Sequence, residues 1–457
     1  MTQRQIITTQ TIFALSSGKG RAGVSVIRLS GPETAAAIEG LSGDRQPVVP
    51  REAHLRWFVD PDNGHRLDRG LLLYFPAPRS FTGEDVAEFH IHGGRAVVSG
   101  FLEALAKIPG LRHAEPGEFS RRAFDNDKMD LTAVEGLADL INAETEAQRR
   151  QALRLMEGRL ADLYEGWRRE IILAMARLEA DIDFADEEIP EDVTDQVRPK
   201  MEILRQNIIH HMGDGFKGER IRDGLQVVIL GAPNIGKSTL LNFLSRRDVA
   251  IVSDIAGTTR DVLEVHLDIK GFPVTVIDTA GIRQSGDVIE AEGIRRAEGR
   301  AATADIKILM TDAGQWPELP DRLRRQIDRN TIILLNKADL HPVSEAKLGK
   351  SSQDAIALLP VSAREESGMA DFLRCLSAEV EKRMELSDAP NLTRLRHRQA
   401  LENCLEHLDR FIENQDKELV LMAEDLRMAA RHLGSISGRV DVEDILDVIF
   451  AEFCIGK

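Results

Sequence analysis

The sequence predicts a chain of several domains: an α+β domain at the N-terminus, followed by an all-α helical domain into which an α/β domain is inserted. Strand-like apolar runs bounded by glycine and proline fill the first 120 or so residues. Helical periodicity then takes over and returns near residue 391, after a segment of buried strands and helices. We expect domain boundaries at residues 1–125, 126–220, 221–380 and 381–457.

Composition restricts the class of protein. With 457 residues, 42% of them hydrophobic, the chain can bury the cores of about three domains. A net charge of −16 argues against loose adhesion to nucleic acid, so any RNA contact requires a local basic patch. The three cysteines are too few and too scattered for a disulfide framework or a zinc site. Apolar runs are too short to span a membrane and the first residues lack a signal peptide core, so we expect a cytosolic protein.

The N-terminal segment predicts four strands and a helix. The strands are TIFALSS, GVSVIRLSG, LLLYFPAP and DVAEFHIHGG, and the helix is RAVVSGFLEALAKI. His90 and His92 fall on one face of the fourth strand, which admits a metal pair. No third ligand lies nearby in sequence, so buried or hydrogen-bonding histidines are favoured.

Long amphipathic segments predict the helical domain. LTAVEGLADLINAETEAQRRQALRLM and LYEGWRREIILAMARLEADI form its first half, with Thr132 and Glu135 spaced as a capping box. RLRHRQALENCLEHLDRFIE, DLRMAARHLGSIS and DVEDILDVIFAEF form the second half. An insertion between two halves of a helical domain allows movement in the inserted domain to lever the helices. The acidic run from Asp181 to Asp192 is expected to be a solvated loop.

The inserted domain begins with a phosphate-binding motif. The apolar run LQVVIL is followed by GAPNIGKST, which matches GxxxxGK[ST]. A strand that ends in a glycine-rich turn and opens a helix directs backbone N–H groups and the helix dipole at one anionic spot. Lys237 is expected to reach the β- and γ-phosphates of a nucleotide, and Ser238 to hold Mg²⁺.

Motifs at three further strand ends predict how the metal is held and which base is bound. VTVIDTAG places Asp278 as the carboxylate that steadies the hydrated metal, and lets the Gly281 amide approach the γ-phosphate. IILLNKAD ends in Asp339, which can accept both the ring N–H and the amino N–H of guanine, a match that adenine cannot make. LLPVSAR brings a backbone amide of its SA dipeptide to the guanine oxygen. Together these motifs predict a P-loop GTPase domain.

The segment between the P-loop and DTAG has the position of a first switch loop. Thr259 is the expected second hydroxyl ligand of Mg²⁺, ordered while the γ-phosphate is present. Ile282 follows DTAG and cannot orient a hydrolytic water as the glutamine of signalling GTPases does. Asn234 can join switch-loop oxygens around a monovalent cation, for which K⁺ fits, or it is a turn residue in left-handed conformation. The residues alone leave these two readings of Asn234 even.

The complete prediction for the nucleotide site covers five short segments. They are Asn234, Ile235, Gly236, Lys237, Ser238 and Thr239; Ser253, Asp254, Ile255, Ala256, Gly257, Thr258 and Thr259; Asp278, Thr279, Ala280 and Gly281; Asn336, Lys337, Ala338 and Asp339; and Ser362, Ala363 and Arg364.

Over its whole length the chain resembles the MnmE (TrmE) family of tRNA modification GTPases. The resemblance is carried by GVSVIRLSG, SFTGEDVAEFHIHGG, EPGEFSRRAFDNDKMDL, the motifs of the inserted domain and the C-terminal FCIGK. It implies a potassium-dependent GTPase that acts with the flavoprotein MnmG (GidA), in a heterotetramer, on C5 of the wobble uridine of certain tRNAs. The products would be of the 5-carboxymethylaminomethyl or aminomethyl type.

The resemblance also implies a reduced folate, 5-formyl- or methylene-tetrahydrofolate, as the source of a one-carbon unit, and a homodimer formed through the N-terminal domain. That domain is similar to folate-binding aminomethyltransferase domains. The positions that match the family's folate contacts are Arg28, Glu84, Lys128 and Lys457. Glu84 can accept from the aminopyrimidine edge of a pterin, and the three cations can meet carboxylate or carbonyl oxygens.

In the inserted domain the resemblance assigns the cation to Asn234, Ser253, the Ile255 carbonyl and Thr258, and Mg²⁺ to Ser238 and Thr259. Glu290 matches the family's catalytic glutamate, which would orient the attacking water through a second water. Without the resemblance Glu290 is an exposed acid at a helix start, and Glu292 would take its place after a small shift of register.

Cys454 falls where the family has a cysteine needed for modification, with nucleophilic attack and simple packing both open. Its CIGK context is a poor prenylation signal, so we expect no membrane anchor. The loop SSGKGRAG lacks the two prolines common in the family, which affects loop rigidity. An alternative reading is a regulatory or ribosome-assembly GTPase that carries out no modification chemistry.

Overall fold

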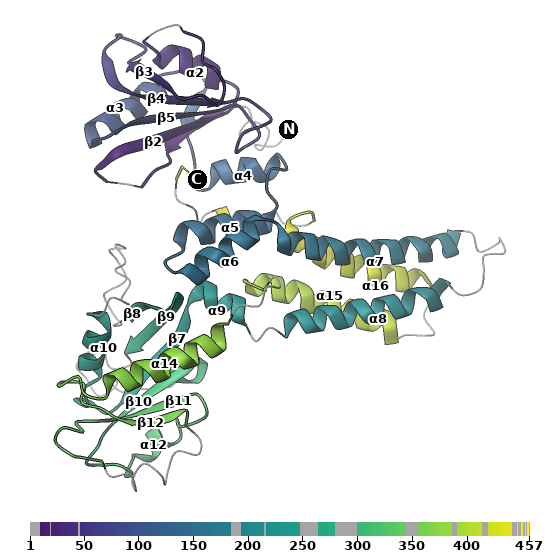
Figure 1. Ribbon diagram of the computed structural model, residues 1–457. Coiled ribbons are helices and arrows are strands. Elements are labelled where there is room, and N and C mark those ends of the chain that lie inside the picture. Colours follow the sequence, from purple (N-terminus) through teal and green to yellow (C-terminus); the bar gives the residue numbers. More distant parts are fainter. Residues whose placement is uncertain are drawn as a thin grey trace, which may run out of the picture. The chain divides into compact units, whose positions relative to one another are not determined.

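The computed structural model describes residues 10–18, 20–43, 46–183, 193–213, 216–246, 264–278, 299–343, 355–385, 391–413, 419–440, 446, 449–450, 453 and 455–456. The chain divides into two compact units (Figure 1). The first unit comprises Met1–Ala138, Leu155–Thr194 and Glu413–Lys457, and the second comprises Asp139–Arg154 and Asp195–Ile412.

The first unit contains a six-stranded sheet. Its strand order is β3-β4-β5-β2-β1-β6, with antiparallel pairs except for the parallel pair β1–β6. The strands are β1 (Thr11–Leu15), β2 (Ala22–Ser30), β3 (His54–Val59), β4 (Arg66–Phe75), β5 (Val86–Gly93) and β6 (Leu111–His113).

Two helices, α2 (Thr34–Leu41) and α3 (Arg95–Ala106), cover one face of this sheet. Side chains alternate between the faces of a strand, so Phe58 of β3 and Phe89 of β5 point to the same side and meet Phe101 of α3 at centroid distances of 5.2–5.3 Å. The helices that bury this face fix the register of the sheet.

The opposite face of the sheet is covered only in part. The helix α4 (Glu118–Asp125) packs Phe119 beside Ile12 of β1. Farther along, Leu55, Trp57 and Leu71 of β3 and β4 are exposed by 58%, 40% and 37%. This sheet therefore presents a patch of apolar side chains, Leu55, Trp57 and Leu71, which we call the β3–β4 patch.

Besides α2 and α3, the described helices of the first unit are α4, most of α5 (Leu131–Asn142), α7 (Arg159–Asp183) and α16 (Leu419–Ser437). The last two pack side by side along their length (Figure 1). The C-terminal residues Ile449, Phe450 and Phe453 pack against Leu131 and Val134 of α5. The end of the chain is thus part of the hydrophobic core of this unit.

The predicted long helix from residue 131 is broken into two. The Asp130 carboxylate accepts hydrogen bonds from the backbone N–H groups of Thr132 and Ala133, so α5 is capped by Asp130. The capping box lies farther on, where Thr145 and Gln148 bond each other's backbone N–H groups and start α6 (Glu146–Met156). The predicted box of Thr132 and Glu135 is therefore wrong, because an aspartate two residues earlier is the better acceptor.

The second unit contains the α/β domain. Its sheet has the order β12-β11-β10-β7-β9-β8, parallel except for the antiparallel pair β8–β9. The strands are β7 (Leu225–Gly231), β8 (Glu264–Ile269), β9 (Phe272–Asp278), β10 (Ile306–Asp312), β11 (Thr331–Asn336) and β12 (Ala357–Pro360).

Helices of the second unit are α6, α8 (Val193–Met212), α9 (Lys217–Asp223), α10 (Lys237–Ser245), α12 (Asp321–Arg324), α14 (Met369–Met384) and α15 (Leu395–Glu413). The central strands are buried on both faces, since Ile308 of β10 belongs to the core under α10 and α14 whereas Leu309 belongs to the core around Trp316. Continuous apolar runs such as TIILLN follow from this two-sided burial.

The three kinds of domain that the sequence predicts are confirmed: an α+β sheet domain, a helical region and an inserted α/β domain. The residue bounds of the four predicted segments stay a prediction. In the part of the chain that the structure describes, no helix is long and apolar enough to cross a membrane.

Candidate functional site

The P-loop connects the end of β7 to the start of α10. Gly236 has a φ of 110°, and a Cβ there would lie 2.4 Å from Nδ2 of Asn336, so only glycine lets the two loops approach. Asn234 is exposed with a φ of 59°, the left-handed conformation expected for a turn residue. Its side chain is open to solvent, and its backbone has the conformation of the turn-residue alternative.

Lys237 opens α10 and is 5% exposed. Its Nζ donates to the backbone oxygens of Gly231 at 2.7 Å and Ala232 at 2.9 Å. Burial lowers the pKa of Lys237, and the charge of Asp278 acts in the opposite direction. A buried ammonium at a helix N-terminus, held by two neutral carbonyls, suits a polyphosphate anion. Ser238 and Thr239 are exposed in the first turn of the same helix, as a metal ligand and a phosphate contact require.

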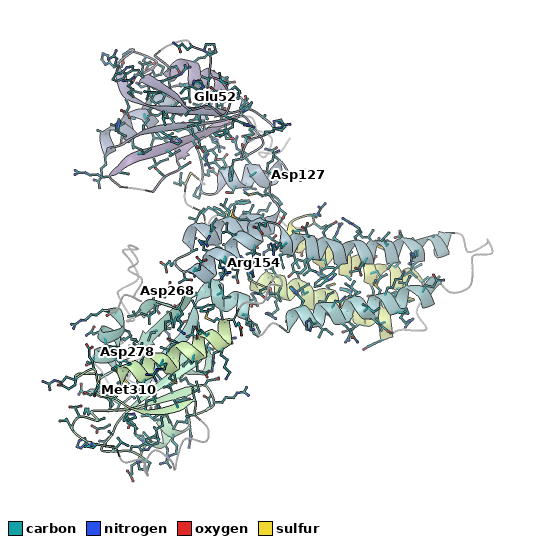
Figure 2. All side chains as sticks on the ribbon, in the orientation of Figure 1. Glu52, Asp127, Arg154, Asp268, Asp278 and Met310 are labelled. Atoms are coloured by element: carbon teal, nitrogen blue, oxygen red, sulfur yellow. The ribbon has the colours of Figure 1, made fainter. Side chains whose placement is uncertain are left out.

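Asp278 ends β9 and is 1% exposed, next to Ile229 of β7 in the register of the sheet. Figure 2 labels it together with Met310, which comes from β10 on the other side of β7. The carboxyl ends of parallel strands meet at one edge, so Asp278 belongs to the same edge as the P-loop. This is where a metal-steadying carboxylate is expected.

Asn336 joins the loops that follow β7, β11 and β12. It is 5% exposed, donates from Nδ2 to the backbone oxygen of Ile235 at 2.7 Å and accepts at Oδ1 from the N–H of Ala363 at 2.9 Å. The asparagine of NKAD therefore does not need the nucleotide for its hydrogen bonds. It instead fixes the P-loop and the SA loop relative to each other.

The residues beside Asn336 shape the expected base pocket. Lys337 has a φ of 62° and its Nζ donates to Asp312 at 2.9 Å. Burial raises the pKa of the Asp312 carboxyl, but the hydrogen bonds from Lys337 and from a backbone N–H outweigh it and lower the pKa overall. The backbone N–H of Ala338 donates to Val361 at 3.1 Å, and Asp339 is exposed. Asp312 was missed in the sequence, where its place at the end of β10 is its only signal.

After β12, Ser362 and Ala363 are buried at the start of the SA loop and Arg364 is exposed. The other predicted nucleotide, cation and catalytic residues lie outside the described residues. They are Ser253, Asp254, Ile255, Ala256, Gly257, Thr258, Thr259, Thr279, Ala280, Gly281 and Glu290.

A second group of predicted residues gathers on the partly covered face of the N-terminal sheet. The Arg28 guanidinium on β2 pairs with the Glu88 carboxylate of β5 at 2.9 Å and lies 5.1 Å from the ring centre of Phe81. Both charged side chains are about one-fifth exposed. Arg28 is thus held against an aromatic ring with part of its donor edge open to solvent.

Glu84 lies in the loop before β5 and is 19% exposed. Its carboxylate accepts from Oγ of Ser30 at 2.6 Å and from the Arg122 guanidinium at 2.9 Å. The exposed Lys128 borders this loop, because a Cβ at Gly83 would lie 3.0 Å from its Cε. The structure therefore brings Arg28, Glu84 and Lys128 to one region of the first unit.

The chain terminus is seated on the same sheet. Ser16 Oγ donates to the backbone oxygen of Gly456 at 2.7 Å, and Ile455 forms a β-bridge with Pro116. Gly456 has a φ of 102°, and a Cβ there would lie 2.1 Å from the backbone oxygen of Leu15. The predicted residues Cys454 and Lys457 flank this contact and are outside the described part of the chain.

The histidines of β5 are bound by carboxylates. His92 Nδ1 lies 2.8 Å from Asp68, and His90 Nε2 lies 3.5 Å from Glu88. Among the residues that were searched, those with described positions, no group of three or more His, Cys, Asp and Glu could hold a metal ion. His92 is therefore a hydrogen-bonding histidine, whereas His90 Nε2 is buried beside Glu88 without a hydrogen-bond partner in the described part of the chain.

The P-loop, the buried Asp278 and the Asn336 tie, at one edge of a parallel sheet, define a protein of the P-loop GTPase class. Family models match both regions: "MnmE helical domain" over residues 131–454 and "GTP-binding protein TrmE N-terminus" over residues 11–128. The chain belongs to the MnmE family of tRNA modification GTPases.

Relatives of nearly equal length agree with this assignment. The tRNA modification GTPase MnmE of Parvibaculum lavamentivorans is 52% identical over 98% of this chain and 100% of its own length. The MnmE of Paramagnetospirillum magneticum is 51% identical with the same coverage. The mitochondrial 5-taurinomethyluridine-[tRNA] synthase subunit GTPB3 of Danio rerio is 46% identical over 98% of this chain and 93% of its own.

The solved G domain of T. maritima FeoB is matched over 34% of this chain and 98% of its own, at 20% identity and a TM-score of 0.26.

Proposed function

We propose that this protein hydrolyses GTP and uses the resulting conformational cycle to modify the wobble uridine of tRNA. The observation that carries the proposal is the pair of hydrogen bonds made by the Asn336 side chain. They fix the phosphate loop and the base-recognition loops relative to each other. Lys237 binds the β- and γ-phosphates, and Asp339 selects guanine through two hydrogen bonds. Lys337 and the Ser362–Arg364 loop border the base.

Magnesium fits the exposed Ser238 hydroxyl and the buried Asp278 carboxylate, with Thr259 as a further ligand, and it neutralises phosphate charge when bound. Potassium would be held by the side-chain oxygen of the exposed Asn234, together with Ser253, the Ile255 carbonyl and Thr258. A cation held there supplies the charge that an arginine finger supplies in other GTPases. Glu290 would orient the attacking water.

The N-terminal unit binds a reduced folate in this proposal. Glu84 accepts from the aminopyrimidine edge, and Arg28, Lys128 and Lys457 bind oxygens of the ligand. Support comes from the grouping of Arg28, Glu84 and Lys128, and from the seat of residue 456 on β1 beside Ser16. Cys454 would act next to this site.

The partners are tRNA, the flavoprotein MnmG in a heterotetramer, and a second copy of this chain. The β3–β4 patch supports the homodimer, because three large exposed apolar side chains on one sheet face favour burial against a partner. We place the protein in the cytoplasm.

Mass spectrometry of tRNA nucleosides from cells that lack the protein tests the proposal. Loss of the C5 modification, restored by the wild-type chain and not by Glu84→Ala, is the expected result. Full modification with Glu84→Ala would favour a regulatory or ribosome-assembly GTPase instead. Hydrolysis rates in KCl and NaCl test the cation separately, since equal rates would remove the role given to Asn234.

A further inference from the structure

A buried arginine stands behind Glu84. We propose that Arg122 is the positioning residue that fixes the Glu84 carboxylate for the aminopyrimidine edge of the reduced folate, an inference that rests on the folate site proposed above. Neither the motifs nor the family match assigns a role to Arg122, which lies 38 positions from Glu84 in the sequence.

Arg122 links two carboxylates inside the first unit. It is 4% exposed on α4, and its Nη1 donates to both oxygens of Glu84 at 2.9 and 3.2 Å. Its Nη2 donates to Glu118 at 3.0 Å and to the backbone oxygen of Gln10 at 2.9 Å. Glu118, 5% exposed, is bound in turn by two nitrogens of Arg112 at 2.6 and 2.8 Å. Charges therefore alternate along a chain of four side chains that ends at Glu84.

A hydroxyl pair holds the same carboxylate from the other side. Ser30 Oγ donates to Oε2 of Glu84 at 2.6 Å and lies 2.7 Å from Oγ1 of Thr82. A serine hydroxyl has a single hydrogen, so Thr82 is the donor in the second contact. Both hydroxyls are fully buried, which fixes their orientation as well as that of Glu84.

The arrangement favours orientation over stability. A buried ion pair contributes little net stability, because desolvation offsets its attraction. A fixed acceptor is useful where a planar donor pair must be recognised, since the geometry is set before the ligand arrives. A carboxylate offers about four lone-pair sites; Ser30 and Arg122 use both on Oε2 and Arg122 uses one on Oε1, which leaves one on Oε1. Glu84 keeps acceptor capacity at its exposed edge, where the ligand would bind.

Calorimetric titration of the full-length protein with 5-formyltetrahydrofolate tests the inference. The same titration with an analogue in which methyl replaces the 2-amino group measures how well the site recognises the aminopyrimidine edge. The Arg122→Lys variant keeps the positive charge but loses the guanidinium group, whose two terminal nitrogens donate to Glu84 and Glu118 at the same time. We expect binding about tenfold weaker and a smaller preference for the 2-amino ligand. Ser30→Ala should show the same two changes at about threefold.

The matched control is Arg112→Lys, the same substitution at the far end of the charge chain. It alters the environment of Glu118 and should lower stability, but it should leave affinity and ligand preference as in the wild type. Arg122→Lys combined with Glu84→Gln should bind no more weakly than Glu84→Gln alone, because Arg122 acts through Glu84.

The outcomes separate the inference from the function it rests on. If the wild type binds neither ligand, the folate site itself is wrong. If the wild type prefers the 2-amino ligand and Glu84→Gln loses that preference while Arg122→Lys keeps it, Arg122 is not the positioning residue. The inference is also overturned if the losses of affinity multiply when Arg122→Lys is combined with Glu84→Gln. It is overturned as well if Arg112→Lys and Arg122→Lys lose affinity and ligand preference equally.

Discussion

The two candidate sites balance buried charge in opposite ways. At the N-terminal site Glu118 lies between Arg112 and Arg122. Burial raises the pKa of its carboxyl, but hydrogen bonds from Arg112, the Glu115 N–H and Arg122 outweigh it and lower the pKa overall. At the nucleotide site burial dominates, and the pKa of Lys237 is lowered despite the charge of Asp278.

This difference indicates which site depends on its ligand. The charges of Arg112, Glu118, Arg122 and Glu84 are paired within the protein, so this part of the N-terminal site is set before a ligand binds. The Lys237 ammonium bonds two neutral carbonyls, so an anionic ligand adds the missing charge and stabilises the second unit. A variant at one site should therefore leave ligand binding at the other site unchanged.

The largest expected effect comes from Lys237→Ala. Removal of a fixed cation from the phosphate site should lower the GTP hydrolysis rate by about 10²- to 10³-fold. Folate binding should be unchanged, because the variant leaves the first unit intact. Initial rates at saturating GTP measure the first effect and calorimetry the second. The exposed Lys200→Ala is the control. A matching loss of folate binding would contradict the separation.

Glu118→Gln should destabilise the first unit by about 3 kcal/mol at pH 7, since it leaves two arginines without their shared carboxylate. The folded-state pKa of Glu118 lies below its ordinary value of 4.5. Its contribution is therefore present above that pH and is lost as the pH falls through the folded-state pKa. Urea unfolding of wild type and variant between pH 7 and pH 3 should show curves that converge in acid. A constant difference would exclude the charge as the cause.

Asn336→Ala should cost about 2 kcal/mol of stability in the second unit, because the Ala363 N–H and the Ile235 oxygen lose a buried partner. Nucleotide affinity should fall with it, since two loops lose their common frame. Denaturant unfolding without GDP measures the stability, and the added stability in the presence of GDP measures the nucleotide affinity. Asn330→Ala, just before β11, is the comparison in the same domain, since it removes a side-chain acceptor for Arg383 away from the nucleotide loops. Unchanged GDP affinity would show that the tie is not needed for binding.

Gly456→Ala should have the smallest effect, about 1 kcal/mol, because the left-handed backbone and the approach to Leu15 both resist a side chain. Folate affinity should fall and GTP hydrolysis should not. Gly18→Ala is the control, since a Cβ there meets nothing within 4 Å. If both variants bind folate as the wild type does, the seat of the terminus has no part in the site.

The sequence makes more specific predictions for the nucleotide site than for the N-terminal site, for a physical reason. Each nucleotide-binding segment is a short contiguous motif at a strand end, so spacing along the chain reports its geometry. The N-terminal site is made of contacts between distant positions: Glu88 is 60 residues from Arg28, and Glu84 is 54 from Ser30. Periodicity carries no information on such pairs, so Glu88, Ser30 and Arg122 were missed.

The strand β3 was missed because its exposed positions carry apolar side chains and one of its buried positions carries a charge. Arg56 is 4% exposed and donates to the Gln46 oxygen at 2.8 Å, whereas Leu55 and Trp57 face outward. Alternation is present, but only Phe58 of the two buried positions is apolar, because Arg56 carries a charge, and the exposed positions carry apolar groups. A pattern that assumes apolar residues inside fails where the exposed positions of a strand carry apolar side chains.

The β8–β9 hairpin has a mechanical consequence. Its turn is held by α6, whose Ala147 N–H donates to Gly271 at 2.9 Å, and by α14, where Glu381 accepts from Lys270 at 2.8 Å. Its other end adjoins the two segments expected to respond to the γ-phosphate. The strands β8 and β9 are paired from Glu264 to Ile269. We therefore expect a displacement at the phosphate end of the hairpin to be transmitted to its turn and to α6.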